Sequence, residues 1–145
     1  MNNKQVSLMS LLFEGKEHDR LETLLKEYAV KKGFNAEVNF KNGMNPDVLL
    51  QDGKRNLFLG DAKDANNEGP SNTSTANRIL GYIKTFAECV STKEISGGYI
   101  AIATNDKDAA SEWKNWLNAA CEDSGLSNPN FMVEQLSINT FIVLW

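Results

Sequence analysis

Three charged residues lie in segments that the sequence otherwise predicts to be buried strands. Asp47 precedes the apolar residues 48–50, and Asp61 and Lys63 end the apolar segment 57–63. A buried charge is costly unless it is paired or bound to a metal, so charges on two such strands indicate a site. The two carboxylates could hold a divalent cation between them, beside the ammonium of the lysine.

The loop between these two strands decides whether the three side chains meet. The intervening residues 52–56 are polar and turn-prone throughout. If all five form the loop, Asp47 lies opposite Asp61, with Cβ atoms about 5 Å apart, and Lys63 shares their face. Two aspartates that close repel one another unless a cation lies between them, and hard oxygen ligands suit Mg²⁺. A tight turn at residues 52–53 would instead place the carboxylates on opposite faces, and no site would form.

Hydrophobic periodicity predicts an α/β chain. Helices are predicted over residues 14–32, over 75–90 and from a cap at Asn105 to about Gly125, and strands over 34–40, 47–51, 57–63, 97–104, 131–133 and 139–145. Strands joined by short loops pair antiparallel, whereas the late strand–helix–strand segment allows a parallel crossover. We therefore expect a mixed sheet with helices on both faces. The polar residues 66–74 are expected to form a loop that could close over a ligand.

Size and composition are those of one globular domain, residues 1–145. Hydrophobic residues make up 41% and charged residues 23% of the sequence, which argues against a disordered chain. The two cysteines are too few for a disulfide scaffold. The single histidine, His18, excludes zinc sites that need two histidines.

Charge limits how this chain could bind nucleic acid. The net charge is −4, and no run of basic residues offers a grip on a polyanion. Binding would therefore need a local basic patch, a metal ion or a partner subunit. No segment approaches the roughly 20 apolar residues of a membrane span, and residues 6–13 lack the cleavage site of a signal peptide. We expect a cytoplasmic protein that does not contact membranes.

The pattern Pro46-Asp47, followed after thirteen residues by Asp61-Ala62-Lys63, resembles the PD-(D/E)XK nuclease superfamily. The resemblance covers residues 14–104, where the predicted order helix, three strands, helix, strand matches the superfamily's core. It implies a restriction-endonuclease-like αβββαβ fold, to which this chain adds a C-terminal helix and strands. It also implies a Mg²⁺-dependent nuclease that cleaves DNA phosphodiester bonds, an endonuclease of the restriction, repair or defence type.

The same resemblance assigns roles to the residues of the motif. Asp47 and Asp61 would bind Mg²⁺, for which Mn²⁺ could substitute, and the backbone carbonyl of Ala62 would be a further ligand. Lys63 would hold or help activate the attacking water and offset charge on the phosphate. In-line attack would leave a 5′-phosphate and a 3′-hydroxyl.

Many members of the superfamily add an acid from the first helix. Glu17 lies four residues before Leu21 and so extends the apolar stripe of this helix by one turn, which makes it the first candidate for a catalytic and metal-binding acid. Glu22 is the rival, one position round the helix, and Glu14 is a weaker one. The plain alternative for Glu17 is a solvated acid near the helix start.

Three other side chains could contact the substrate. Arg78 and Tyr82 are spaced i and i+4 on the second predicted helix, where some branches of the superfamily hold substrate with a similar pair. His18 could contact a phosphate or a water molecule. In the plain alternative, Tyr82 packs in the core while Arg78 and His18 are exposed. Asp64 is expected to be a solvated residue at the end of its strand.

Two other functions compete with the nuclease. A net charge of −4 makes this chain a poor reader of DNA by itself, so a nuclease is expected to be a homodimer or a subunit of a larger nuclease complex. The first alternative is a non-catalytic nuclease-fold module that binds nucleic acid or a protein partner. The second is an α/β binding domain outside the superfamily, in which Asp61 and Lys63 form only a structural ion pair.

Overall fold

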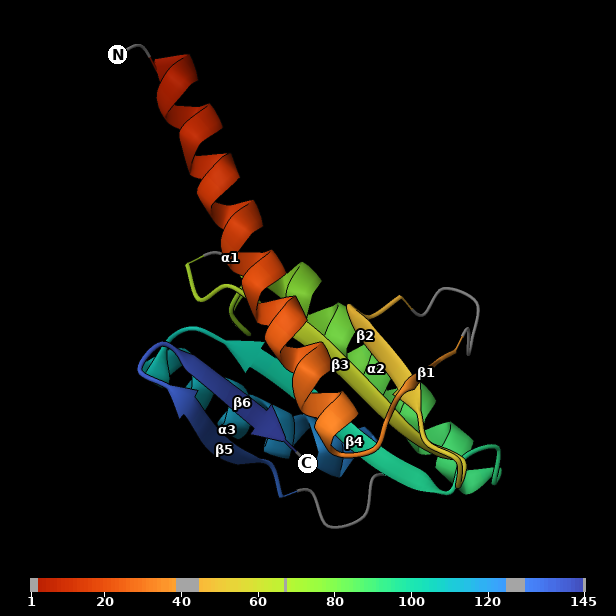
Figure 1. Cartoon of the computed structure of the whole chain (residues 1–145). Helices are drawn as coiled ribbons and strands as arrows, with labels where there is room; N and C mark the ends of the chain where they lie inside the picture. Colours follow the sequence, from red (N-terminus) through yellow and green to blue (C-terminus); the bar gives the residue numbers. More distant parts are fainter. Residues whose placement is uncertain (1–2, 39–44, 67, 125–129, 145) are drawn as a thin grey trace.

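The elements follow one another in the predicted order of a helix, three strands, a helix, a strand, a helix and the final strands (Figure 1). The computed structural model describes residues 3–38, 45–66, 68–124 and 130–144. Its elements are α1 (Asn3–Lys31), β1 (Ala36–Glu37), β2 (Val48–Gln51), β3 (Asn56–Lys63), α2 (Thr73–Ser91), β4 (Gly97–Thr104), α3 (Lys107–Ser124), β5 (Met132–Ser137) and β6 (Thr140–Leu144).

The strands form one mixed sheet in the order β1-β2-β3-β4-β6-β5. The pair β3–β4 is parallel and is joined by α2, and the other neighbours are antiparallel. The predicted mixed sheet is thus confirmed, but the late strand–helix–strand segment makes no parallel pair. Instead, β6 lies antiparallel beside β4, and β5, its partner in a hairpin, is the outer strand.

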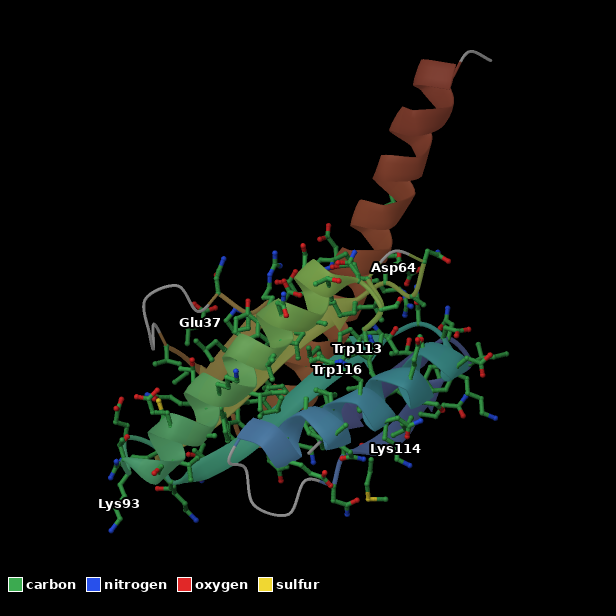
Figure 2. All side chains as sticks on the ribbon, turned by 180° about the vertical axis from the view of Figure 1, so that it is seen from behind. Glu37, Asp64, Lys93, Trp113, Lys114 and Trp116 are labelled. Carbon is green, nitrogen blue, oxygen red and sulfur yellow. The ribbon has the colours of Figure 1, made fainter. Side chains whose placement is uncertain are left out.

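Helices cover both faces of the sheet, as predicted. α1 crosses one face, and α2 and α3 lie on the other, where the fully buried Trp113 packs in their layer (Figures 1 and 2). Side chains of β3 alternate between these layers: Phe58 packs with Leu21 of α1, whereas Leu57 and Leu59 pack in the layer of α2 and α3. Continuing this alternation, residues 61 and 63 point toward the side of α2.

The first helix is longer than predicted. It begins at Asn3 rather than near residue 14, and its N-terminal half extends beyond the sheet (Figure 1). Residues 3–14 are rich in strong helix formers, and a single Gly15 costs a helix only about 1 kcal/mol. The predicted end is confirmed, because Gly33 has a φ of 99°, the left-handed conformation typical of a residue that follows a helix.

Two other boundaries differ from the predictions. Only Ala36–Glu37 of the predicted strand 34–40 pairs as β1, and residues 39–40 lie outside the described part. Asp106, rather than Asn105, caps α3, since its carboxylate accepts a hydrogen bond from the Ala109 amide at 3.0 Å. The predicted end near Gly125 also lies outside the described residues.

Within the described residues, we find no helix with the length and apolar character that crossing a membrane requires.

Candidate functional site

The register of β2 and β3 places Asp47 opposite Asp61. Val48 pairs with Gly60 and Gln51 with Leu57, which leaves residues 52–56 as the loop, as predicted. The backbone N–H of Asp47 donates to Oδ1 of Asp61 at 2.8 Å. The N–H of Ala62 donates to Oδ2 of Asp47 at the same distance. The two carboxylates therefore tie the start of β2 to the end of β3.

The loop that sets this register is held by Asp52. Its carboxylate accepts hydrogen bonds from the side chain of Asn56 at 2.9 Å and from the amides of Asn56 and Lys54 at 3.0 and 2.8 Å. These hydrogen bonds lower the pKa of Asp52, and the bond from the Asn56 side chain has the largest effect. A two-residue turn at 52–53 would break this arrangement, so the sequence of the loop fixes the site's register.

Asp61 and Lys63 form a buried ion pair. Lys63 Nζ lies 3.0 Å from Oδ2 of Asp61, and each side chain is only 3% exposed. Burial raises the pKa of Asp61, and the neighbouring Lys63 ammonium opposes that shift. Both residues lie on the predicted strand and face, but the pair is covered rather than open to solvent.

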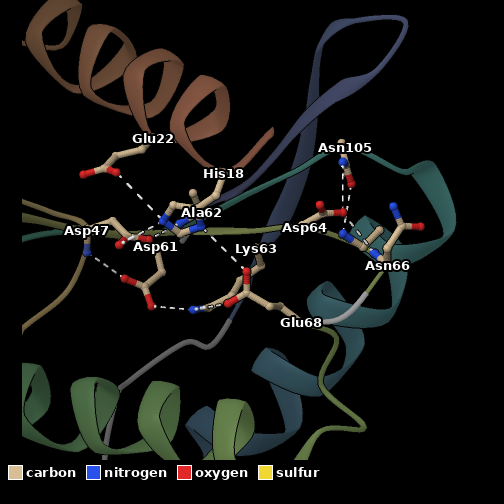
Figure 3. A network of polar contacts seen from close by, with 11 residues as sticks. His18, Glu22, Asp47, Asp61, Ala62, Lys63, Asp64, Asn66, Glu68 and Asn105 are labelled. Carbon is tan, nitrogen blue, oxygen red and sulfur yellow. Dashed lines mark hydrogen bonds and ion pairs between the residues drawn. The ribbon is translucent and has the colours of Figure 1, made fainter. Parts of the chain in front are cut away.

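Helix α1 contributes His18 and Glu22, which lie beside Asp47 (Figure 3). His18 Nε2 lies 3.3 Å from Oδ1 of Asp47 and 3.8 Å from Oε2 of Glu22. One ligand atom from each of these three residues lies within 4.8 Å of the other two. Burial, followed by the charge of Asp47, raises the pKa of Glu22. A nitrogen and two carboxylate oxygens at this spacing suit a divalent cation.

The structure places Glu17, the first candidate acid, in a different contact. Its carboxylate pairs with Arg20, whose guanidinium also donates to Oγ1 of Thr140 at 2.7 Å and to the carbonyl of Asn139 at 3.2 Å. Glu17 therefore lies on the flank of α1 that faces the β5–β6 hairpin. Glu22, the predicted rival, is the helix acid near Asp47, and the side chain of Glu14 lies outside the described residues.

Tyr82 of α2 lies near the two aspartates. It is 5% exposed, and burial, together with the negative charges of Asp61 and Asp47, raises its pKa to about 12. The positive charge of Arg78, four residues earlier on α2, acts on the pKa of Tyr82 in the opposite direction. Tyr82 also packs in the core, as its plain alternative predicted, and Arg78 is exposed.

Glu68 is a member of the site that the sequence did not single out. One of its oxygens lies 3.4 Å from Lys63 Nζ and the other lies 3.7 Å from His18 Nδ1. It belongs to the polar segment 66–74 that was predicted to form a loop near a ligand. Because Glu68 is the only acid in this segment, the sequence alone could have identified it as a candidate site residue.

Asp64 is buried, and the prediction that it is solvated was wrong. It is 3% exposed, and its Oδ1 accepts hydrogen bonds from Asn105 Nδ2 at 3.2 Å and from the Asn66 amide at 3.1 Å. Asn105 Oδ1 in turn accepts from the Ala65 amide at 2.9 Å. These contacts fix the chain where it leaves β3, immediately before Glu68 (Figure 3).

A cavity of about 480 Å³ lies at the opposite end of β3 from the candidate site. Its lining residues are Lys32, Phe34, Asp52, Asn56, Gly98 and Tyr99. Neither Asp47 nor Asp61 lines it. The candidate site itself meets solvent through Asp47, His18 and Glu68, whose side chains are 24–29% exposed.

In comparisons with known proteins, the chain matches no protein-family model, no curated protein and no solved structure.

Proposed function

We propose that this chain is a metal-dependent nuclease of the PD-(D/E)XK type, acting on DNA. The observation that carries the proposal is the register that sets Asp47 opposite Asp61, with Lys63 on the same face. The element order from α1 to β4 fits the αβββαβ core that the resemblance implies. Together, motif, register and element order support this function better than the short motif does alone.

The donor set near Asp47 fits a divalent cation. Glu22 and Asp47 offer hard carboxylate oxygens, and Asp61 is the next carboxylate, while His18 adds an imidazole nitrogen. Oxygen ligands suit Mg²⁺, whereas a nitrogen in the set favours a transition metal, so we expect Mn²⁺ to serve at least as well as Mg²⁺. When bound, such a cation would polarise the phosphate and favour deprotonation of the attacking water. The carbonyl of Ala62 remains a predicted further ligand.

The chain's own residues would have separate tasks. Asp47, Glu22 and His18 would hold the cation at the exposed side of the site. Lys63, whose Nζ lies 3.0 Å from Oδ2 of Asp61, would offset negative charge developing on the phosphate. Arg78, exposed on α2, would contact the substrate backbone.

The charge of the site bears on its partners. The site brings together four carboxylates, from Glu22, Asp47, Asp61 and Glu68, with the ammonium of Lys63, and the whole chain carries a charge of −4. This excess suits a cation but repels DNA phosphates. We therefore propose that additional DNA contacts come from a second copy of the chain or from another subunit of a nuclease complex.

DNA cleavage in defined metal conditions tests this function. Plasmid, linear, single-stranded and branched DNA would be incubated with the protein in Mg²⁺, in Mn²⁺ and with a chelator. We expect cleavage only with metal, and expect Asp47→Asn to remove it. Glu17→Gln, on the other flank of α1, is the matched control and should retain activity. Cleavage that survives both the chelator and Asp47→Asn would contradict the proposal.

One observation favours a second candidate, the α/β binding domain outside the superfamily. Asp61 and Lys63 are 3% exposed and paired with each other, which is also the arrangement of a structural ion pair. A wild type that binds DNA or a protein without cleaving any substrate, and whose binding is unchanged when both residues are replaced by neutral ones, would support this candidate.

A further inference from the structure

The carboxylate of Glu68 bridges two possible donors that come from different elements. Its Oε2 faces Lys63 of β3 and its Oε1 faces His18 of α1, at 3.4 and 3.7 Å (Figure 3). Asp61 holds the same lysine more closely, at 3.0 Å. Charged hydrogen bonds to nitrogen are typically about 2.7–2.9 Å long, so both contacts of Glu68 are loose.

These two donors form a place for an anion with two oxygens. Lys63 has three N–H groups on Nζ, and Asp61 is its close partner on only one side. If Nε2 of His18 binds a cation together with Asp47, the imidazole proton is on Nδ1, which then donates toward the position of Glu68. The two free oxygens of a phosphodiester could meet the same two donors.

We propose that Lys63 and His18 form a phosphodiester-binding subsite, and that Glu68 occupies it as an internal anion which the substrate displaces. The inference rests on the proposed function, because it names the part of the site that receives the substrate phosphate. When the substrate phosphate replaces the Glu68 carboxylate, Lys63 keeps an anion on this side. The exchange therefore leaves no buried charge without a partner. Glu68 is 29% exposed and can turn into solvent when it leaves.

Two other roles for Glu68 make different predictions. As a metal ligand, or as a residue that orients His18 for metal binding, Glu68 would raise the affinity for the cation. Among the described residues, the group close enough to share an ion contains His18, Glu22 and Asp47 but not Glu68. As an internal anion, Glu68 would lower the affinity for DNA instead.

The affinity of Glu68→Gln for DNA distinguishes these roles. Binding of a short single-stranded oligonucleotide would be measured in Ca²⁺, after confirming that no cleavage occurs. We expect Glu68→Gln to bind about ten-fold more tightly than the wild type, as removal of a direct competitor implies. Glu88→Gln, an exposed acid near the far end of α2, makes the same change in net charge and should alter affinity by less than about two-fold.

A double-mutant cycle shows whether the effect passes through Lys63. In the background Asp61→Asn/Lys63→Met, where the ion pair is replaced by neutral side chains, Glu68→Gln should gain less than about two-fold. An equal gain in both backgrounds, no gain at all, or the same gain in Glu88→Gln would overturn the subsite. So would a ten-fold loss of Mn²⁺ affinity in Glu68→Gln, since this loss would show a role in metal binding.

The two proposals can fail separately. If the wild type cleaves no DNA but Glu68→Gln gains affinity only when Lys63 is present, the anion subsite stands and the nuclease is wrong. If the wild type cleaves DNA and Glu68→Gln shows no gain, the nuclease stands and the subsite is wrong.

Discussion

The backbone amide of Asp47 donates to the carboxylate of Asp61 at 2.8 Å, and these two residues face each other across the ends of β2 and β3. Asp47 completes the link by accepting from the Ala62 amide. Each carboxylate therefore has a structural role besides the proposed chemical one. Substitution to Asn keeps an acceptor for these amides, so Asn variants are the appropriate probes of charge.

Removing one charge of the buried pair should be more harmful than removing both. Asp61→Asn leaves Lys63 buried with only the loose contact to Glu68, and we expect it to lower the free energy of unfolding by about 3–5 kcal/mol. The double variant Asp61→Asn/Lys63→Met leaves no unpaired charge and should be within about 1 kcal/mol of the wild type. Urea denaturation measures both. A double variant as unstable as the single one would contradict this account of the pair.

The two acids of α1 should differ in metal binding. Glu22 lies with His18 near Asp47, whereas Glu17 pairs with Arg20 on the other flank. We expect Glu22→Gln to weaken Mn²⁺ binding by about 10–100-fold and Glu17→Gln to leave it unchanged. Calorimetric titration with Mn²⁺ compares the two variants, which have the same net charge. The reverse order of affinities would place the metal on the hairpin side of the helix.

Cys121 should resist modification until the protein unfolds. Burial raises the pKa of its thiol to about 11 from an ordinary value of 9.0. At pH 8 its thiolate is then about 100-fold less abundant than that of a free cysteine, and modification should be slower by at least this factor. Between pH 9 and 11 the unfolded thiol ionises before the folded one, so the free energy of unfolding should fall as the pH rises.

Labelling with a thiol reagent at pH 8, followed by mass spectrometry, identifies which cysteine reacts. Labelling of Cys121 in the folded protein as fast as in a short peptide would contradict the assigned burial.

Two glycines should respond oppositely to replacement by alanine. Gly98 has a φ of 141°, and a Cβ there would lie 1.8 Å from the carbonyl oxygen of Leu57, so Gly98→Ala should cost more than about 4 kcal/mol. Gly81 is exposed within α2, and its Cβ would meet nothing within 4 Å, so Gly81→Ala should stabilise by about 1 kcal/mol. The urea midpoint of each variant checks the sign, and a stable Gly98→Ala would contradict the β3–β4 pairing.

The sequence reduced the pairing of Asp47 with Asp61 to a choice between a five-residue loop and a tight turn at residues 52–53. The structure has the five-residue loop, held by the carboxylate of Asp52, and strand alternation then fixes the face of Lys63. The layers of helices could also be predicted from the hydrophobic stripes. These features depend on residues that are close together in the sequence.

The choice of the helix acid depended on distant residues. A step of four residues turns a helix about 40° beyond a full turn, so Glu17 does not lie directly above Leu21. Glu17 lies on the flank of α1 where its partner Arg20 contacts Thr140 of the β5–β6 hairpin, more than a hundred positions later in the sequence. The sequence near Glu17 does not show this contact. Glu68 could have been named as the acid of a loop expected near a ligand, but its contacts with Lys63 and His18 depend on how this loop folds back.

The rate of DNA cleavage by the wild type and by Asp47→Asn, in saturating Mn²⁺, is the most direct test of the proposed nuclease. Asp47 is 24% exposed, and its Asn variant keeps the hydrogen bond from Ala62, so a loss of rate would report the lost charge rather than a lost fold. We predict that the wild type cleaves DNA and that Asp47→Asn is slower by about 100-fold or more, with Glu17→Gln unchanged. Equal rates for the wild type and Asp47→Asn, or no cleavage by the wild type on any DNA substrate, would contradict the account.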